Sequence, residues 1–192
     1  GTLVTIIGIL GFFIIKEPSV TPVKDSYIGG IIYGFRPKTI RQNPKLYLNL
    51  LAFIIFDVSI HIFMPYLIIY YEVSLGMTNY VLIMAPAIII ASVVTAFWGK
   101  VYDKKGFSFS GLAAVLSLIS GYIILFFTST TIPVFIGSLL MMCGYLSGMA
   151  VFGAIIRDNT PVGYSGRLQG VRIFSQVLIP GIVGPMIGKK VL

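Results

Sequence analysis

The stretch from Asn79 to Thr128, NYVLIMAPAIIIASVVTAFWGKVYDKKGFSFSGLAAVLSLISGYIILFFT, decides the fold class. It contains two mostly apolar runs, Asn79–Tyr102 and Phe109–Thr128, on either side of a short basic segment. An α-helix needs about 20 such residues to cross the hydrocarbon core of a bilayer. Neither run alternates apolar and polar residues as an outer-membrane strand would. The stretch therefore predicts two membrane-spanning helices joined by a short loop.

Four further segments are apolar enough to belong to the same kind of bundle. Leu46–Tyr71 and Ile132–Ile156 have full spanning length, Val171–Gly188 is slightly short, and the opening run Thr2–Ile15 predicts the end of a truncated helix. We therefore expect an all-α membrane protein with about five to six transmembrane helices. The expected organisation is a helix end at 1–15, a basic linker at 16–45 and a truncated transmembrane bundle at 46–192.

Composition places most of the surface against lipid. Of the 192 residues, 57% are hydrophobic and only 10% are charged. A soluble domain carries roughly 25% charged residues, so this chain has too few charges to cover a water-facing surface. We expect a lipid bilayer as its surroundings.

The positions of the basic residues explain the net charge of +8. They gather in alternate loops, whereas the segments 73–78 and 129–131 contain no Lys or Arg. Basic loops of membrane proteins stay in the cytoplasm. The pattern predicts a multi-pass protein of the cell membrane with its loops 16–45, 100–108 and 157–170 in the cytoplasm, and it argues against a nucleic-acid partner. Lys189 and Lys190 alone fall outside this pattern.

An acid and a histidine mark the predicted helix Leu46–Tyr71. Asp57 and His61 lie near its centre, four residues apart and hence on one face. A charge near mid-bilayer costs at least about 2.5 kcal/mol, and such residues usually serve a function. Burial favours the neutral form of a carboxyl group, and a carboxyl that exchanges its proton suits proton coupling. The alternative is a purely structural pair. Tyr145, on the predicted helix Ile132–Ile156, is a further candidate for solute contact.

The sequence contains no recognisable enzyme motif. It has neither a nucleophile elbow, nor a zinc-protease motif, nor a phosphate-binding loop. One histidine and one cysteine cannot build a metal cluster. We therefore expect no catalytic residues, no metal and no cofactor. A structural or assembly subunit of a membrane complex and, less favoured, a membrane-embedded enzyme stay open as alternatives.

The loop between the two opening runs carries a motif. Residues 99–107 read GKVYDKKGF, which resembles the cytoplasmic-loop motif of the major facilitator superfamily, Gly-x-x-x-Asp-Arg/Lys-x-Gly-Arg/Lys. Gly99, Asp103, Lys104 and Gly106 occupy its key positions, and Phe107 departs where a basic residue is usual.

The motif has a physical rationale. A glycine permits close contact between helices, and Asp103 can meet the positive end of a neighbouring helix. Such a contact would latch one conformation until the helices rock apart. Arg157, on another loop of the same predicted side, is a candidate partner for Asp103.

The resemblance covers essentially the whole chain. The superfamily has two six-helix halves joined by a long cytoplasmic loop, and this chain resembles the C-terminal half from the end of helix 6 to helix 11. It implies that Leu46–Tyr71 and Ile132–Ile156 line a central cavity, and that the N-terminal half of the same transporter is a partner. The implied function is secondary transport of a small solute by alternating access, in either direction. We expect Asp57 and His61 to serve proton coupling or solute contact.

Overall fold

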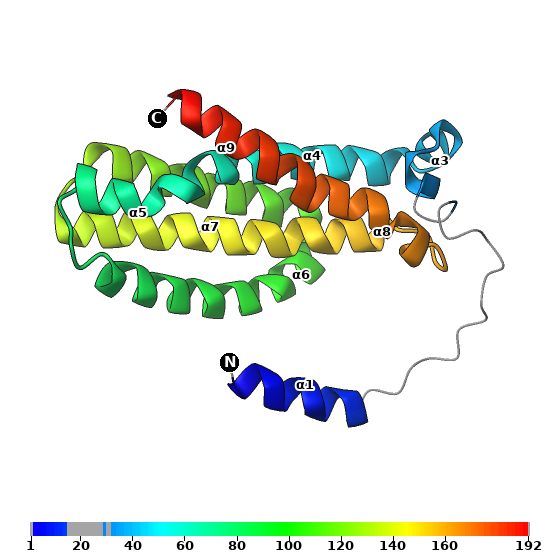
Figure 1. Cartoon of the computed structure of the whole chain (residues 1–192), viewed down its shortest axis with the longest axis horizontal. Helices are drawn as coiled ribbons and strands as arrows, with labels where there is room; N and C mark the ends of the chain where they lie inside the picture. Colours follow the sequence, from blue (N-terminus) through cyan, green and yellow to red (C-terminus); the bar gives the residue numbers. More distant parts are fainter. Residues whose placement is uncertain (1, 15–28, 30–31, 192) are drawn as a thin grey trace.

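The computed structural model describes residues 2–14, 29 and 32–191. Its described residues form helices and contain no strand, as the sequence predicts. Helix α1 (Thr2–Ile14) lies apart from the other helices, which pack together lengthwise (Figure 1). Lys16, Lys24 and most of the first half of the predicted linker lie outside the described residues.

Two short helical segments, η1 and α3, precede the long helices of the bundle. The bounds are η1 Tyr33–Phe35, α3 Pro37–Gln42, α4 Pro44–Phe63, η2 Met64–Tyr66, α5 Leu67–Ile69, η3 Tyr70–Ser74, α6 Val81–Phe127, α7 Thr131–Asp158, α8 Ser165–Ile173, η4 Phe174–Leu178 and α9 Ile179–Val191. Four continuous helical stretches among the described residues are long and apolar enough to cross a membrane: Pro44–Ser74, Val81–Phe127, Thr131–Asp158 and Ser165–Val191.

One of these stretches is two helices in one. Helix α6 has 47 residues, more than twice the roughly 20 that one crossing requires. It reverses at Gly106, whose φ of +75° and ψ of −178° are open almost only to glycine. The two predicted runs on either side of the motif are thus confirmed as helices. The loop predicted at 100–108 is wrong in extent, because both helices continue to this single glycine.

The long helices alternate in direction, so their ends fall into two groups (Figure 1). The start of α4, the reversal of α6, the end of α7 and the start of α8 share one end of the bundle. The basic segments of the sequence follow these same points. The structure therefore gathers them at one end, as the charge pattern predicts; which side of a membrane that end faces stays a prediction.

Helix α7 packs closely against the second half of α6, which follows Gly106. A Cβ on Gly144 would lie 2.7 Å from the Cα of Leu118, and one on Gly121 would lie 2.8 Å from the Cα of Met141. Backbones can approach this closely in membranes only where residues are small. Gly144 of α7 and Gly121 of α6 therefore serve close helix packing.

The stretch Pro44–Ser74 loses regular α-helical geometry after Phe63, where helix α4 ends. Pro65 lies in the 3₁₀ turn η2, and the stretch ends in the π-helical turn η3. Proline removes a backbone donor, which breaks the regular hydrogen-bond ladder. The last stretch has a similar π-helical turn, η4, between α8 and α9. Helices α4 and α9 pack against each other, and each is adjoined by an irregular turn within its spanning stretch.

Candidate functional site

Asp57 lies on the buried face of α4. The face is formed by residues spaced alternately three and four apart, which is the spacing of one helix face. Its apolar members are Leu46, Leu50, Phe53 and Ile60, each at most 2% exposed. Asp57 occupies the same stripe and is 1% exposed. The sequence thus places a carboxyl group where packing alone would favour an apolar side chain.

His61, one turn further along α4, lies against Asp57. Its Nδ1 lies 2.9 Å from the main-chain oxygen of Asp57 and 3.4 Å from the Oδ1 of the same residue. The shorter distance is a hydrogen bond, whereas neither carboxylate oxygen of Asp57 has a hydrogen-bond partner among the described residues. A buried carboxylate is costly unless it is paired and hydrogen-bonded. The prediction that the two residues share a helix face is confirmed, and their contact is loose.

Two other helices enclose this pair. Gly184 of α9 packs on His61, because a Cβ there would lie 3.0 Å from the Cα of His61. Tyr145 of α7 lies within electrostatic range of Asp57 and is half-buried. The side chain of His61 remains 35% exposed, so one edge of the pair is open. Tyr145 therefore belongs to this site by position, and its solute contact stays a prediction.

An aromatic cluster lies next to the pair along α4. The ring centroids of Phe56 and Phe152 are 5.0 Å apart, and those of Phe53 and Phe152 are 5.5 Å apart. Phe107, which directly follows the reversal of α6, lies 5.3 Å from Phe152. The residue that departs from the family motif is thus a packing residue between α6 and α7. Periodicity alone did not reveal this role.

Two of the motif residues, Gly99 and Asp103, line a cavity of about 280 Å³ near the basic end of the bundle. Its walls are Gly99, Tyr102, Asp103, Ala150, Val151, Ala154 and Arg157. Asp103 and Lys104 are exposed, as is Gly106 at the reversal. No described atom lies within 4 Å of a Cβ built on Gly99. The close helix contact expected at Gly99 is therefore absent from the described part of the chain, and the glycine opens onto the cavity instead.

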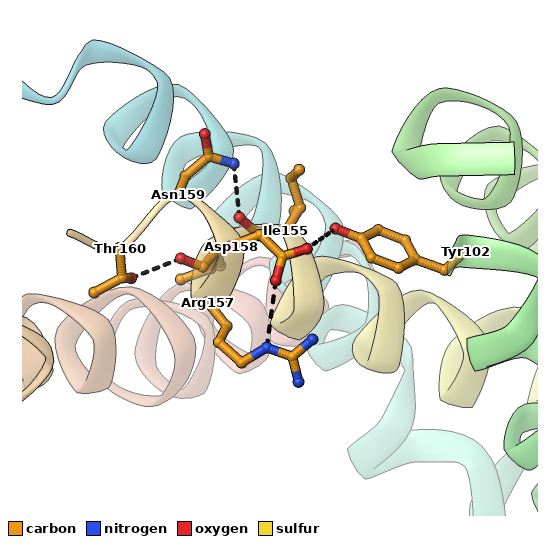
Figure 2. A network of polar contacts seen from close by, with 7 residues as sticks. Tyr102, Ile155, Arg157, Asp158, Asn159 and Thr160 are labelled. Carbon is orange, nitrogen blue, oxygen red and sulfur yellow. Dashed lines mark hydrogen bonds and ion pairs between the residues drawn. The ribbon is translucent and has the colours of Figure 1, made fainter. Parts of the chain in front are cut away.

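Arg157 does not pair with Asp103. Its Nε lies 3.4 Å from Oδ1 of the adjacent Asp158, and the hydroxyl of Tyr102 donates to Oδ2 of Asp158 at 2.6 Å (Figure 2). The candidate pairing of Asp103 with Arg157 is thus wrong for this conformation. Asp158 is the next residue in the chain after Arg157, and the hydroxyl of Tyr102 fixes the Asp158 carboxylate beside it.

Tyr70 and Tyr71 pack between helices. The hydroxyl of Tyr70 donates to the main-chain oxygen of Leu125 at 2.5 Å. Tyr71 is fully buried, and its hydroxyl shares a hydrogen bond with that of Ser138. Their hydroxyl groups therefore serve contacts with α6 and α7.

The described residues include no group of three or more His, Cys, Asp or Glu side chains that could hold a metal ion. The site chemistry among them is an acid–histidine pair within the bundle and a charged cavity at its basic end. Together with helices of spanning length, these features define a multi-pass α-helical membrane protein.

A family model described as Major Facilitator Superfamily matches residues 1–185, and the chain belongs to this superfamily. Its members are membrane transporters that carry small solutes across a lipid bilayer, and this chain is part of such a transporter. Searches of curated proteins and of solved structures found no match.

Proposed function

We propose that this chain moves its solute by alternating access and that proton binding at Asp57 drives the cycle. The observation that carries the proposal is the carboxyl group of Asp57, which is 1% exposed and makes no hydrogen bond among the described residues. Ionisable groups within membrane segments are rare and usually mark ion or proton pathways. A purely structural pair would be expected to have its hydrogen bonds satisfied.

His61 would pass the proton between Asp57 and the open side of the site. Its Nδ1 bonds to the main chain of Asp57, which fixes the ring, and its side chain is 35% exposed. A ring held at one edge and open at the other can exchange protons with water or solute. Tyr145 would contact the solute beside this pair.

Asp103 would act in the conformational cycle. It is exposed at the basic end of the bundle and lines the cavity that also contains Arg157. In a two-half transporter, this exposed carboxylate would meet a helix end of the other half in one conformation and lose that contact in the next. The other half, the cytoplasmic position of this end and the location in the cell membrane are parts of the same proposal.

The experiment that tests the proton site needs no known solute. Infrared difference spectra recorded across a pH titration detect the protonation of a buried carboxyl group. We expect a carboxyl band that disappears in Asp57→Asn, because the amide cannot take up the proton. The matched control is Glu72→Gln, which removes an exposed carboxyl group from the same helical stretch.

In the control the buried-carboxyl band should remain. If Asp57→Asn is folded, as judged by thermal unfolding, and its spectrum matches that of the parent, Asp57 does not titrate and the coupling role fails. A structural subunit would give this second result.

A further inference from the structure

The segment before α4 packs against α8 and the π-helical turn η4 that follows it. Gly34 is buried, and a Cβ there would lie 3.0 Å from the Cβ of Val171. The rings of Phe35 and Phe174 meet edge to face with centroids 5.4 Å apart. The hydroxyl of Tyr47 donates to the main-chain oxygen of Gly34. The described part of the linker from residue 32 onward is therefore a packed part of the bundle.

Aromatic rings and guanidinium groups hold the same contact. Tyr33 stacks on Tyr164, with centroids 5.6 Å apart and an interplanar angle of 22°. The guanidinium of Arg36 lies 6.0 Å from the centroid of the Tyr33 ring, and that of Arg167 lies 5.4 Å from the same centroid. Both guanidinium groups therefore lie within the range of a cation–π interaction with the Tyr33 ring. A cavity of about 210 Å³ opens beside them.

The charged side chains described at this contact are basic. Arg36, Lys38, Arg41 and Lys45 are exposed, and Arg167 is half-buried beside them; these five residues are the basic patch. The sequence has no Asp or Glu between Ser26 and Phe56, and none after Asp158. Repulsion among such cations is relieved by an anionic partner.

The basic patch lies at the end of the bundle where two helical stretches of spanning length begin. The spanning stretches Pro44–Ser74 and Ser165–Val191 both begin there, and Figure 1 shows α3 beside the start of α8 at that end. Apolar side chains stand exposed next to the cations: Ile32 is 49% exposed, Phe35 41% and Ile40 40%. Cations at headgroup level combined with exposed apolar groups are the features that bind anionic membrane surfaces.

We propose that the basic patch binds the headgroup of an anionic phospholipid, with its acyl chains against Ile32, Phe35 and Ile40. The lipid would bridge the linker segment and the start of α8. This assignment is independent of the solute, of proton coupling and of which side of the membrane the patch faces.

The test places a fluorophore on Ile40→Cys in a Cys143→Ser background, in the intact transporter reconstituted into vesicles. Phosphatidylglycerol or phosphatidylcholine carrying a nitroxide on the acyl chain then quenches the fluorophore. At equal mole fraction we expect the anionic lipid to be enriched at the label by roughly fivefold or more, from about 1 kcal/mol per cation near an anionic surface. The paired variant Arg36→Gln with Lys38→Gln should lose most of this preference.

The matched control is Lys189→Gln with Lys190→Gln, which removes two exposed, adjacent cations from the far end of α9. It should keep the preference. In the unsubstituted protein, high salt should weaken the preference through screening, which tests the proposal without any change in folding.

Equal quenching by the two lipids would overturn the proposal. So would a preference that the control variant loses and the Arg36 variant keeps. Removal of the preference by millimolar inorganic phosphate at constant ionic strength would reassign the patch to soluble anions and would likewise overturn the lipid assignment.

Discussion

At the scale of single residues, glycines determine how closely the helices pack, and one acid lies among the buried apolar side chains. Gly144 and Gly121 let two helices approach to backbone contact, and Asp57 takes a position that its neighbours fill with apolar side chains. The sequence allowed Asp57 and His61 to be found, because ionisable groups in apolar runs are conspicuous. It could not reveal that the carboxylate of Asp57 makes no hydrogen bond within the described part of the chain, because that depends on which side chains of α7 and α9 reach it.

Gly144→Ala should destabilise the bundle by about 1–3 kcal/mol. Its new Cβ would lie 2.7 Å from both the main-chain oxygen of Ala114 and the Cα of Leu118, so α6 and α7 must separate. Thermal unfolding of the purified protein measures the loss. The matched control on the same helix is Gly153→Ala, where nothing described lies within 4 Å, and this variant should unfold at the parent temperature or above. Equal behaviour of the two variants would contradict the packing of α7.

At the scale of elements, the sequence predicted the long helices but not the residue at which one helix turns back into the next. Apolar runs identify spans because the bilayer requires about 20 of such residues. The motif at 99–107 looked like a loop, since its composition is basic and rich in glycine. The structure shows helix up to Lys105 and a reversal at Gly106. Composition does not distinguish a loop from two helix ends that meet at one residue, because both expose charged side chains.

Gly106→Ala should strain this reversal by about 1–3 kcal/mol, since alanine rarely adopts a φ of +75°. The expected result is a lower unfolding temperature. Gly99→Ala serves as the control, because Gly99 is helical and no described atom lies within 4 Å of its Cβ position. An unfolding temperature for Gly106→Ala at or above that of Gly99→Ala would show that the chain does not need the positive φ.

At the scale of the whole molecule, all basic segments within the described residues, apart from Lys189 and Lys190, meet at one end of the bundle. The charge pattern predicted this grouping because alternate loops of antiparallel helices share a side. In this conformation Arg157 lies against Asp158 and not against Asp103, and the hydroxyl of Tyr102 donates to the same Asp158 carboxylate. Sequence spacing cannot settle such a choice between neighbouring carboxylates.

Asp103→Asn should slow transport by about two- to fivefold, which corresponds to the loss of one carboxylate at a helix end. Solute binding should persist, because Asp103 lies at the basic end and away from the pair of Asp57 and His61. Turnover in vesicles and ligand-induced thermal stabilisation, measured side by side, separate the two effects. Loss of binding together with turnover would show that Asp103 belongs to the solute site and is no latch.

Proton movement driven by solute is the most direct measurement. Vesicles containing the transporter and an internal pH-sensitive dye are given an imposed pH gradient and then exposed to sugars, organic anions and lipophilic cations in turn. We expect one of these classes to dissipate the gradient through the parent protein and to leave it intact in a folded Asp57→Asn variant. Dissipation of equal rate in both proteins, or no response of the parent to any class, would contradict proton-coupled transport at Asp57.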